Sequence, residues 1–222
     1  MFKLIIGNKN YSSWSLRPWF LLRQADIPFE EVLIPLYEQE WKAHIHKYSP
    51  TGKLPCLIDG KVVVWDSLAI CEYIAEVFSG CYLLPRDAAV RAEVRAVSAE
   101  MHAGFASLRK TMPMNVRKRY PGHGRTAETM ADIERIVEIW QSCRQRFADK
   151  GPFLFGELTL ADAMFAPVCT RFLTYGVELP EPARSYMHFI LNTPAMQIWY
   201  REALTEPYII PSSELDDEVE AV

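Results

Sequence analysis

Residues 54–67 read Leu-Pro-Cys-Leu-Ile-Asp-Gly-Lys-Val-Val-Val-Trp-Asp-Ser. The stretch holds two short apolar runs, at 55–58 and 61–64, which are joined by Asp59-Gly60. Asp-Gly between two such runs is a strong signal for a two-residue β-hairpin. Asp66-Ser67 then supplies a helix cap, because apolar residues follow at helical spacing. The stretch therefore predicts two antiparallel strands followed by a helix.

The residues before the hairpin predict a β-α-β unit. A β-rich run at 2–6 ends at Gly7, a helical pattern covers 14–24, and an alternating run covers 29–34. Two strands joined through a helix pair in parallel by a right-handed crossover. With the hairpin as an antiparallel edge, residues 1–80 predict a thioredoxin-like α/β domain.

The pattern becomes helical after Gly80. We expect helices over 87–112, after Thr126, over 161–173, over 181–192 and over 194–203, and a capping-type box at 159–162 precedes the third of these. The fold class is therefore α/β plus all-α. The predicted domains are 1–80, thioredoxin-like, and 87–210, a C-terminal helical bundle, followed by an acidic, mobile tail at 211–222.

Composition excludes several classes of protein. Half of the 222 residues are apolar and 12% are aromatic, which a disordered chain does not reach. No apolar run is long enough for a signal-peptide core or a membrane span, so we expect no membrane association. Five widely spaced cysteines without a Cys-x-x-Cys pair indicate free thiols in a reducing compartment, so we expect a cytoplasmic protein.

The formal net charge of −4 arises at the C-terminus. Residues 213–222 carry five acids and no base, and outside them 24 basic residues stand against 23 acidic ones. This near-equal number of basic and acidic residues does not indicate a polybasic surface, so we expect no nucleic-acid partner. His44 and His46 have no acidic residue or cysteine with them that could serve as a further metal ligand, so we expect no metal site.

Two segments place hydroxyl groups at predicted helix starts. Tyr11-Ser12-Ser13-Trp14-Ser15 lies between the first strand and the first helix, and Asp66-Ser67 precedes the helix after the hairpin. A helix N-terminus favours an anion and stabilises a thiolate brought close to it. Simple N-capping of the two helices is the alternative reading, since Ser and Asp are favoured caps.

Leu54-Pro55 is a third candidate. A cis peptide bond in a tight turn would leave the backbone of Leu54 free to pair with a peptide laid alongside it. An ordinary trans proline that opens an edge strand is the alternative.

Taken together, these stretches resemble the glutathione transferase superfamily of the serine type. The matching segments are YSSWSLRPW at 11–19, SPTGKLPCLIDG at 49–60, WDSLAICEYI at 65–74 and LTLADAMFAPV at 158–168. They occur in order over nearly the whole chain. SSWSLR at 12–17 is similar to the zeta-class Ser-Ser-Cys-x-x-Arg signature with Trp14 in place of its cysteine, whereas Gly52-Lys53 is closer to theta-like members.

The resemblance implies roles for named residues. Ser12 or Ser13 would hydrogen-bond the glutathione sulfur, with Ser12 slightly favoured. The cofactor-binding residues would be Lys53, Leu54, Pro55, Asp66 and Ser67: Leu54 pairs with the cysteinyl backbone, Asp66 and Ser67 hold the γ-glutamyl end, and Lys53 contacts a carboxylate. It also implies a homodimer, glutathione as co-substrate, and a small apolar electrophile. Met101, His102, Phe105 and Leu108 are the residues expected to line the electrophile pocket.

Overall fold

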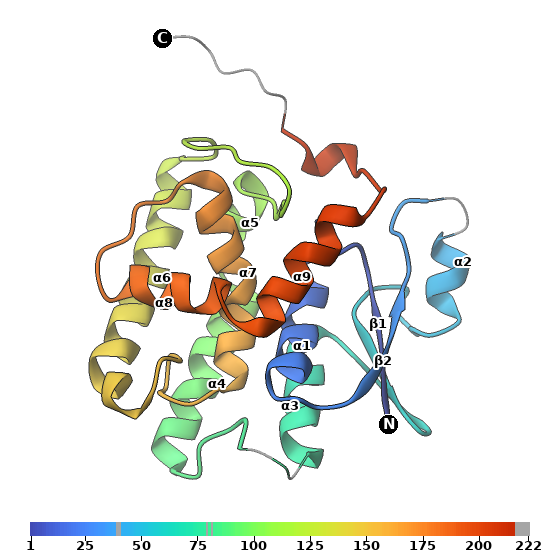
Figure 1. Cartoon of the computed structure of the whole chain (residues 1–222), viewed down its shortest axis with the longest axis horizontal. Coiled ribbons are helices and arrows are strands. Elements are labelled where there is room, and N and C mark those ends of the chain that lie inside the picture. Colours follow the sequence, from blue (N-terminus) through green and yellow to red (C-terminus); the bar gives the residue numbers. More distant parts are fainter. Residues whose placement is uncertain (39–40, 79, 81, 216–222) are drawn as a thin grey trace.

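A four-stranded mixed sheet forms the first domain, in a computed structural model that describes residues 1–38, 41–78, 80 and 82–215 (Figure 1). The strands are β1 (Phe2–Ile6), β2 (Phe29–Leu33), β3 (Cys56–Asp59) and β4 (Val62–Trp65). Their order is β2-β1-β3-β4, with β1 and β2 parallel and the other two pairs antiparallel. The predicted thioredoxin-like layout is confirmed.

Helices cover both faces of this sheet. They are α1 (Ser13–Gln24), α2 (Trp41–His46) and α3 (Ser67–Val77). Successive side chains of a strand point to opposite faces. Accordingly Leu4 and Ile6 join the main core with residues of α1 and α3, whereas Ile5 packs in a second cluster with Ile45 of α2.

The second domain is helical, as the sequence predicts. Its helices are α4 (Ala88–Ala103), α5 (Ala106–Thr111), α6 (Ala127–Phe147), α7 (Leu160–Tyr175), α8 (Ala183–Leu191) and α9 (Pro194–Thr205), with single 3-10 turns at Ala148–Lys150 and Pro211–Ser213. Residues 87–112, a stretch long for one helix and interrupted by Gly104, form two helices, α4 and α5. The break falls at Gly104 and Phe105, where Phe105 has a left-handed φ of 57°. This residue ends the hydrogen-bond ladder of α4.

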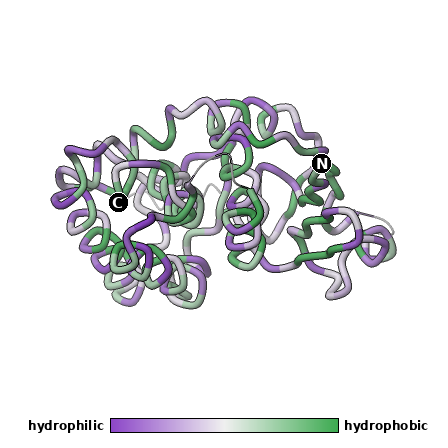
Figure 2. The backbone as a smooth tube through the Cα atoms, turned by 90° about the horizontal axis from the view of Figure 1, so that it is seen from below, coloured by the Kyte–Doolittle hydropathy of each residue, from purple (hydrophilic) through white to green (hydrophobic). Residues whose placement is uncertain are grey.

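The two domains meet along α1. This helix packs against α7 of the helical domain, and α9 also contacts it. Figure 1 shows the strands on the right and most of the helical domain on the left, and in Figure 2 the N-terminus again lies toward the right. The buried ammonium of Lys9, just before α1, binds Glu31 at 2.5 Å and also Glu202 on α9. In the part of the chain that the structure describes, no helix is both long and apolar enough to cross a bilayer.

The C-terminal segment after α9 returns to the first domain. The Glu206 carboxylate accepts the backbone N–H groups of Lys9 and Asn10 at 2.7 and 3.0 Å. The Glu214 carboxylate accepts hydrogen bonds from Tyr11 and Tyr120. Glu214, within the tail expected at 211–222, thus contacts the body of the protein through these hydrogen bonds. Residues 216–222 lie outside the described residues.

A buried carboxylate organises the start of α7. Asp162 accepts the backbone N–H groups of Leu154 and Thr159, both at 2.9 Å, and the hydroxyl groups of Thr159 and Tyr186, both at 3.1 Å. Burial raises the pKa of Asp162 to about 6, although all of these donors favour the charged form. The capping box expected at 159–162 is present and joins the loop before α7 to α8.

We expect Asp162→Asn to destabilise the protein. Both carboxylate oxygens of Asp162 accept hydrogen bonds from N–H or O–H groups. In asparagine an NH2 group replaces one of these oxygens and cannot accept the hydrogen bonds donated to it. The free energy of unfolding should fall by about 2–4 kcal/mol, which urea unfolding followed by circular dichroism measures. The exposed Asp149→Asn variant is the matched control. Equal unfolding midpoints for the two variants would contradict this role.

Candidate functional site

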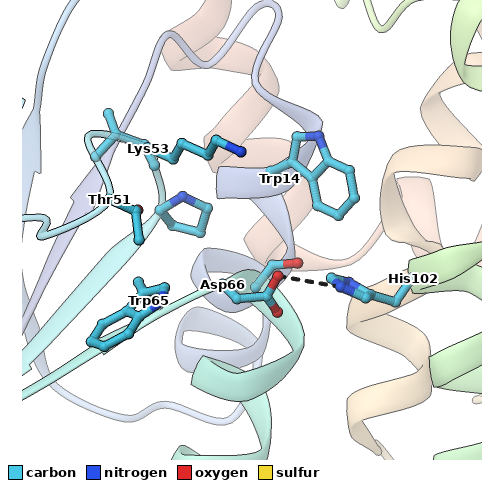
Figure 3. Close-up of a pocket in the computed structure, with 9 residues that line it drawn as sticks. Trp14, Thr51, Lys53, Trp65, Asp66 and His102 are labelled. Carbon is cyan, nitrogen blue, oxygen red and sulfur yellow. Dashed lines mark ion pairs between the residues drawn. The ribbon is translucent and has the colours of Figure 1, made fainter. Parts of the chain in front are cut away.

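A cavity of about 480 Å³ opens where the two domains meet. It is lined by Trp14, Thr51, Lys53, Leu54, Pro55, Trp65, Asp66, Ser67 and His102. In Figure 3, Lys53 and Trp65 extend from one side, Trp14 and His102 from the other, and Asp66 lies between them. The five residues expected to bind glutathione therefore line one cavity, although they come from two separate parts of the sequence.

A second cavity of about 320 Å³ adjoins the first and shares Trp14, Lys53 and Leu54 with it. Its other lining residues are Tyr11, Ser12, Leu36, Tyr37, Trp41, Ile45, Gly52, Ile210, Ser212 and Ser213. The lining is mostly aromatic and aliphatic, with Lys53 as its one charged side chain among these residues. An elongated ligand lying across Leu54 could occupy both cavities.

Ser12 lies at the start of α1. Its hydroxyl oxygen caps the helix by accepting the N–H of Ser15 at 3.4 Å, and its proton goes to the Ser15 hydroxyl at 2.8 Å. Ser15 in turn accepts the N–H of Gly7 at 3.0 Å, which holds the loop after β1. Ser12 therefore caps the helix and also lines the second cavity. A role in capping and a role in binding a ligand are thus compatible for this residue.

Ser13 is placed differently. Its hydroxyl accepts a hydrogen bond from Arg171 of α7 at 3.3 Å, and it lines neither cavity. Arg171 is buried and also donates to the backbone carbonyl of Met112 at 2.8 Å. Ser13 thus contributes to the contact between the domains.

The turn before β3 exposes backbone to the cavities. The Leu54–Pro55 bond is cis. Among the residues that the structure describes, neither the N–H nor the C=O of Leu54 has a hydrogen-bond partner. Gly52 has a φ of +64°, and a Cβ there would lie 2.7 Å from the His46 ring. Only glycine fits this tight approach without strain.

The N-terminus of α3 forms the other end of the first cavity. Asp66 caps the helix by accepting the N–H groups of Leu68 and Ala69 at 2.9 and 3.3 Å. Its φ of 75° lies in a region that non-glycine residues rarely adopt. Such backbone strain costs roughly 1–3 kcal/mol and is typical of functional sites. Capping thus holds Asp66 and Ser67 at the cavity wall.

A buried guanidinium stands behind this wall. Arg17 of α1 donates to the Ser67 hydroxyl at 3.1 Å and stacks on the Trp14 ring at 4.3 Å. Burial, together with the nearby cations Arg171 and Arg109, lowers the pKa of Arg17 to about 9. Since Ser67 accepts from Arg17, its own proton is free to be donated into the cavity. The sequence motif includes Arg17 but does not predict this contact.

Three of the four residues expected to line the electrophile pocket do not line either of the two cavities. Met101, Phe105 and Leu108 are buried in the main core, and only His102 of that set reaches a cavity. The second cavity instead uses residues near α2 and the segment 210–213. No local pattern marks that segment, because it approaches Ser12 only in the folded chain.

The four described cysteines are free and buried, and burial raises the pKa of each thiol. Cys81 lies outside the described residues. His44 and His46 are exposed on α2, and within the described ranges no three His, Cys, Asp or Glu side chains come together as metal ligands would. The candidate site therefore consists of hydroxyl, carboxylate, cationic and backbone groups.

The fold and the cavities together define a two-domain protein whose thioredoxin-like domain carries a ligand cleft. Residues 11–77 match the model of the glutathione S-transferase N-terminal domain, and residues 91–190 match that of the C-terminal domain. Glutathione S-transferase 1 of Dianthus caryophyllus is 33% identical over 184 residues, which cover 81% of this chain and 82% of that protein. The chain belongs to the glutathione S-transferase family.

Two further relatives widen this comparison. A probable maleylacetoacetate isomerase of Caenorhabditis elegans is 28% identical over 170 residues, covering 75% of this chain and 77% of that protein. The crystal structure of a glutathione transferase homolog from Burkholderia GL BGR1, with bound glutathione, has a TM-score of 0.68 at 20% identity. It covers 91% of this chain and 98% of its own, which supports the shared fold.

The wall of the second cavity at 210–213 depends on Glu214. This carboxylate accepts from Tyr11, Tyr120 and Asn115, so Glu214→Ala removes three hydrogen bonds to a charged group. We expect faster hydrogen exchange of the amides at 210–215, by about tenfold or more for each 1.4 kcal/mol lost. Mass spectrometry of exchanged peptides measures this, with the exposed Glu178→Ala as control. Unchanged protection would show that other contacts hold the segment.

Proposed function

We propose that this chain is a serine-type glutathione transferase that holds the glutathione thiol as a thiolate at Ser12 and presents it to a small apolar electrophile. One observation carries the proposal: Ser12, Leu54 and Asp66 line two joined cavities, at the ends of α1 and α3 and at the turn between them. Conjugation and isomerisation both begin from such a thiolate.

The cavities fit the length and chemistry of glutathione. The γ-glutamyl end would lie in the first cavity, where Asp66 would hold its ammonium and Ser67 would donate to its carboxylate. The cysteinyl backbone would pair with the free N–H and C=O of Leu54. Lys53 lies between the cavities, where it would meet a carboxylate of the ligand.

The thiol would then face the start of α1. A free thiol has a pKa of about 8.5, so lowering it by two units requires roughly 2.7 kcal/mol of differential stabilisation. The Ser12 hydroxyl supplies a donor once it turns from Ser15 toward sulfur, and the helix N-terminus adds a favourable field. Ser13 is already engaged by Arg171, which supports Ser12 as the residue that meets the thiol.

The electrophile would bind in the second cavity. Its walls include Tyr11, Trp41 and Ile210, which suit an apolar molecule. We further propose that the protein is a cytoplasmic homodimer with a role in detoxification, as the family resemblance implies.

A non-catalytic binding or regulatory protein of the same fold is the alternative. It is favoured by the hydrogen bond from Ser12 to Ser15, at 2.8 Å, which engages the proton that a thiolate would need. The two functions differ in the pKa of the bound thiol, which ultraviolet titration of the protein–glutathione complex measures. Tight binding with an unshifted thiol pKa would favour the binding protein.

The Ser12→Ala and Ser13→Ala pair tests the assignment of the thiol-binding serine. Ser12→Ala should raise the pKa of bound glutathione by about 1–2 units and lower turnover of an aryl halide by about tenfold or more near neutral pH. Ser13→Ala should keep the thiol pKa and instead lower stability, because Arg171 loses an acceptor. The reverse pattern would assign the thiol to Ser13. Absence of glutathione binding to the unaltered protein would overturn the whole proposal.

A further inference from the structure

The Asp66 carboxylate is shared between two roles. It accepts the N–H groups at the start of α3 through Oδ1, while Oδ2 lies 3.2 Å from Nε2 of His102 (Figure 3). His102 comes from α4 of the helical domain, so this contact crosses the cavity from one domain to the other. The oxygen that faces His102 is thus the one left over after helix capping.

The His102 ring is held in one orientation. It packs edge-to-face on Trp14, with ring centroids 5.4 Å apart at 78°, and only 26% of its side chain is exposed. Among the described residues, its Nδ1 is buried and has no hydrogen-bond partner. A neutral imidazole carries a single N–H, and here it belongs at Nε2, where Asp66 can accept it.

Charged groups around His102 oppose its protonation. Burial lowers its pKa below the usual 6.5, Arg17 of α1 and Arg109 of α5 lower it further, and Asp66 raises it. Lys53 lines the same cavity, and Arg171 of α7 lies behind Arg17. On α3, Glu72 is already paired with Arg95, two turns earlier on α4. Burial and these cations therefore favour the neutral imidazole, whose Nε2 faces Oδ2 of Asp66.

We propose that His102 is a positioning residue for the amino end of the ligand: neutral, it orients Asp66 toward the cavity, and protonated, it competes with the ligand ammonium for the same carboxylate. This inference rests on the proposed binding of the γ-glutamyl group at Asp66. Two cations cannot share one carboxylate oxygen without mutual repulsion. Binding of the ammonium and protonation of His102 should therefore oppose each other.

This competition determines whether acidification strengthens or weakens ligand binding. As the pH falls through the pKa of His102, the fraction of protein with a neutral imidazole decreases. The ligand binds this neutral form more tightly than the protonated form. The apparent Kd should therefore rise on acidification, toward about tenfold for each pH unit below the pKa. The same linkage requires the bound ligand to lower the pKa of His102.

The test uses S-methylglutathione, which has no thiol to titrate and keeps the γ-glutamyl ammonium. Its Kd is measured by calorimetry from about pH 7.5 to about pH 5.0, a range that brackets an ordinary histidine. The full-length protein is compared with His102→Gln, whose amide keeps a donor for Asp66 but cannot be protonated in this range. The exposed His188→Gln on α8 is the matched control.

We expect Kd to rise about threefold or more for the unaltered protein and for His188→Gln, and to change by less than about 1.5-fold for His102→Gln. In the unaltered protein, nuclear magnetic resonance should show the pKa of His102 fall when the ligand is added. Binding that is independent of pH, or a His102→Gln variant with the unaltered pH dependence, would overturn the role of His102 and leave the glutathione site standing. Absence of S-methylglutathione binding at every pH would overturn both.

Discussion

The convergence of two helix N-termini at one edge of the sheet is the constraint on which the site depends. β1 is antiparallel to β3 and β3 is antiparallel to β4, so β1 and β4 run in the same direction. Each leads directly into a helix, and α1 and α3 therefore begin at the same edge. Their unpaired N–H groups and the positive ends of their dipoles face one cleft. Ser12 and Asp66 lie there because they cap these helices, and Ser67 is the first residue of α3. In the proposed binding mode, the capping groups would also serve the ligand.

The electrostatics of the cleft differ from those of the whole chain. The formal net charge is −4, yet burial together with nearby arginines lowers the pKa of Arg17 and of Arg171. Both side chains are buried, and the hydrogen bonds that they donate within the described part of the chain go to hydroxyl or carbonyl oxygens. A tripeptide with two carboxylates and a thiolate would suit such a field, and in the proposed binding mode Asp66 would hold its ammonium.

Short stretches of sequence predicted those structural features that depend on interactions between residues close together in the chain. The Asp-Gly hairpin, the β-α-β unit and the capping box at Asp162 depend on neighbouring residues, and the protein contains all three. Gly104 and the length of the stretch 87–112 hinted at the break before α5, but the left-handed conformation of Phe105 has no local signal. Met101 and Leu108 were expected at a pocket from their position in the chain. Packing of α4 against α7 and of α5 against α6 instead accompanies their burial in the core.

The sequence by itself determined the order of the elements, the caps of α1 and α3, and the candidate residues for a glutathione site, since each follows from residue types at short spacing. Only the tertiary structure decided which groups meet: Arg17 with Ser67, Arg171 with Ser13, His102 with Asp66, and Glu214 with Tyr11. These partners are up to 203 residues apart. No short-range pattern encodes such pairs, because they form when the two domains pack along α1 and bring distant side chains into contact.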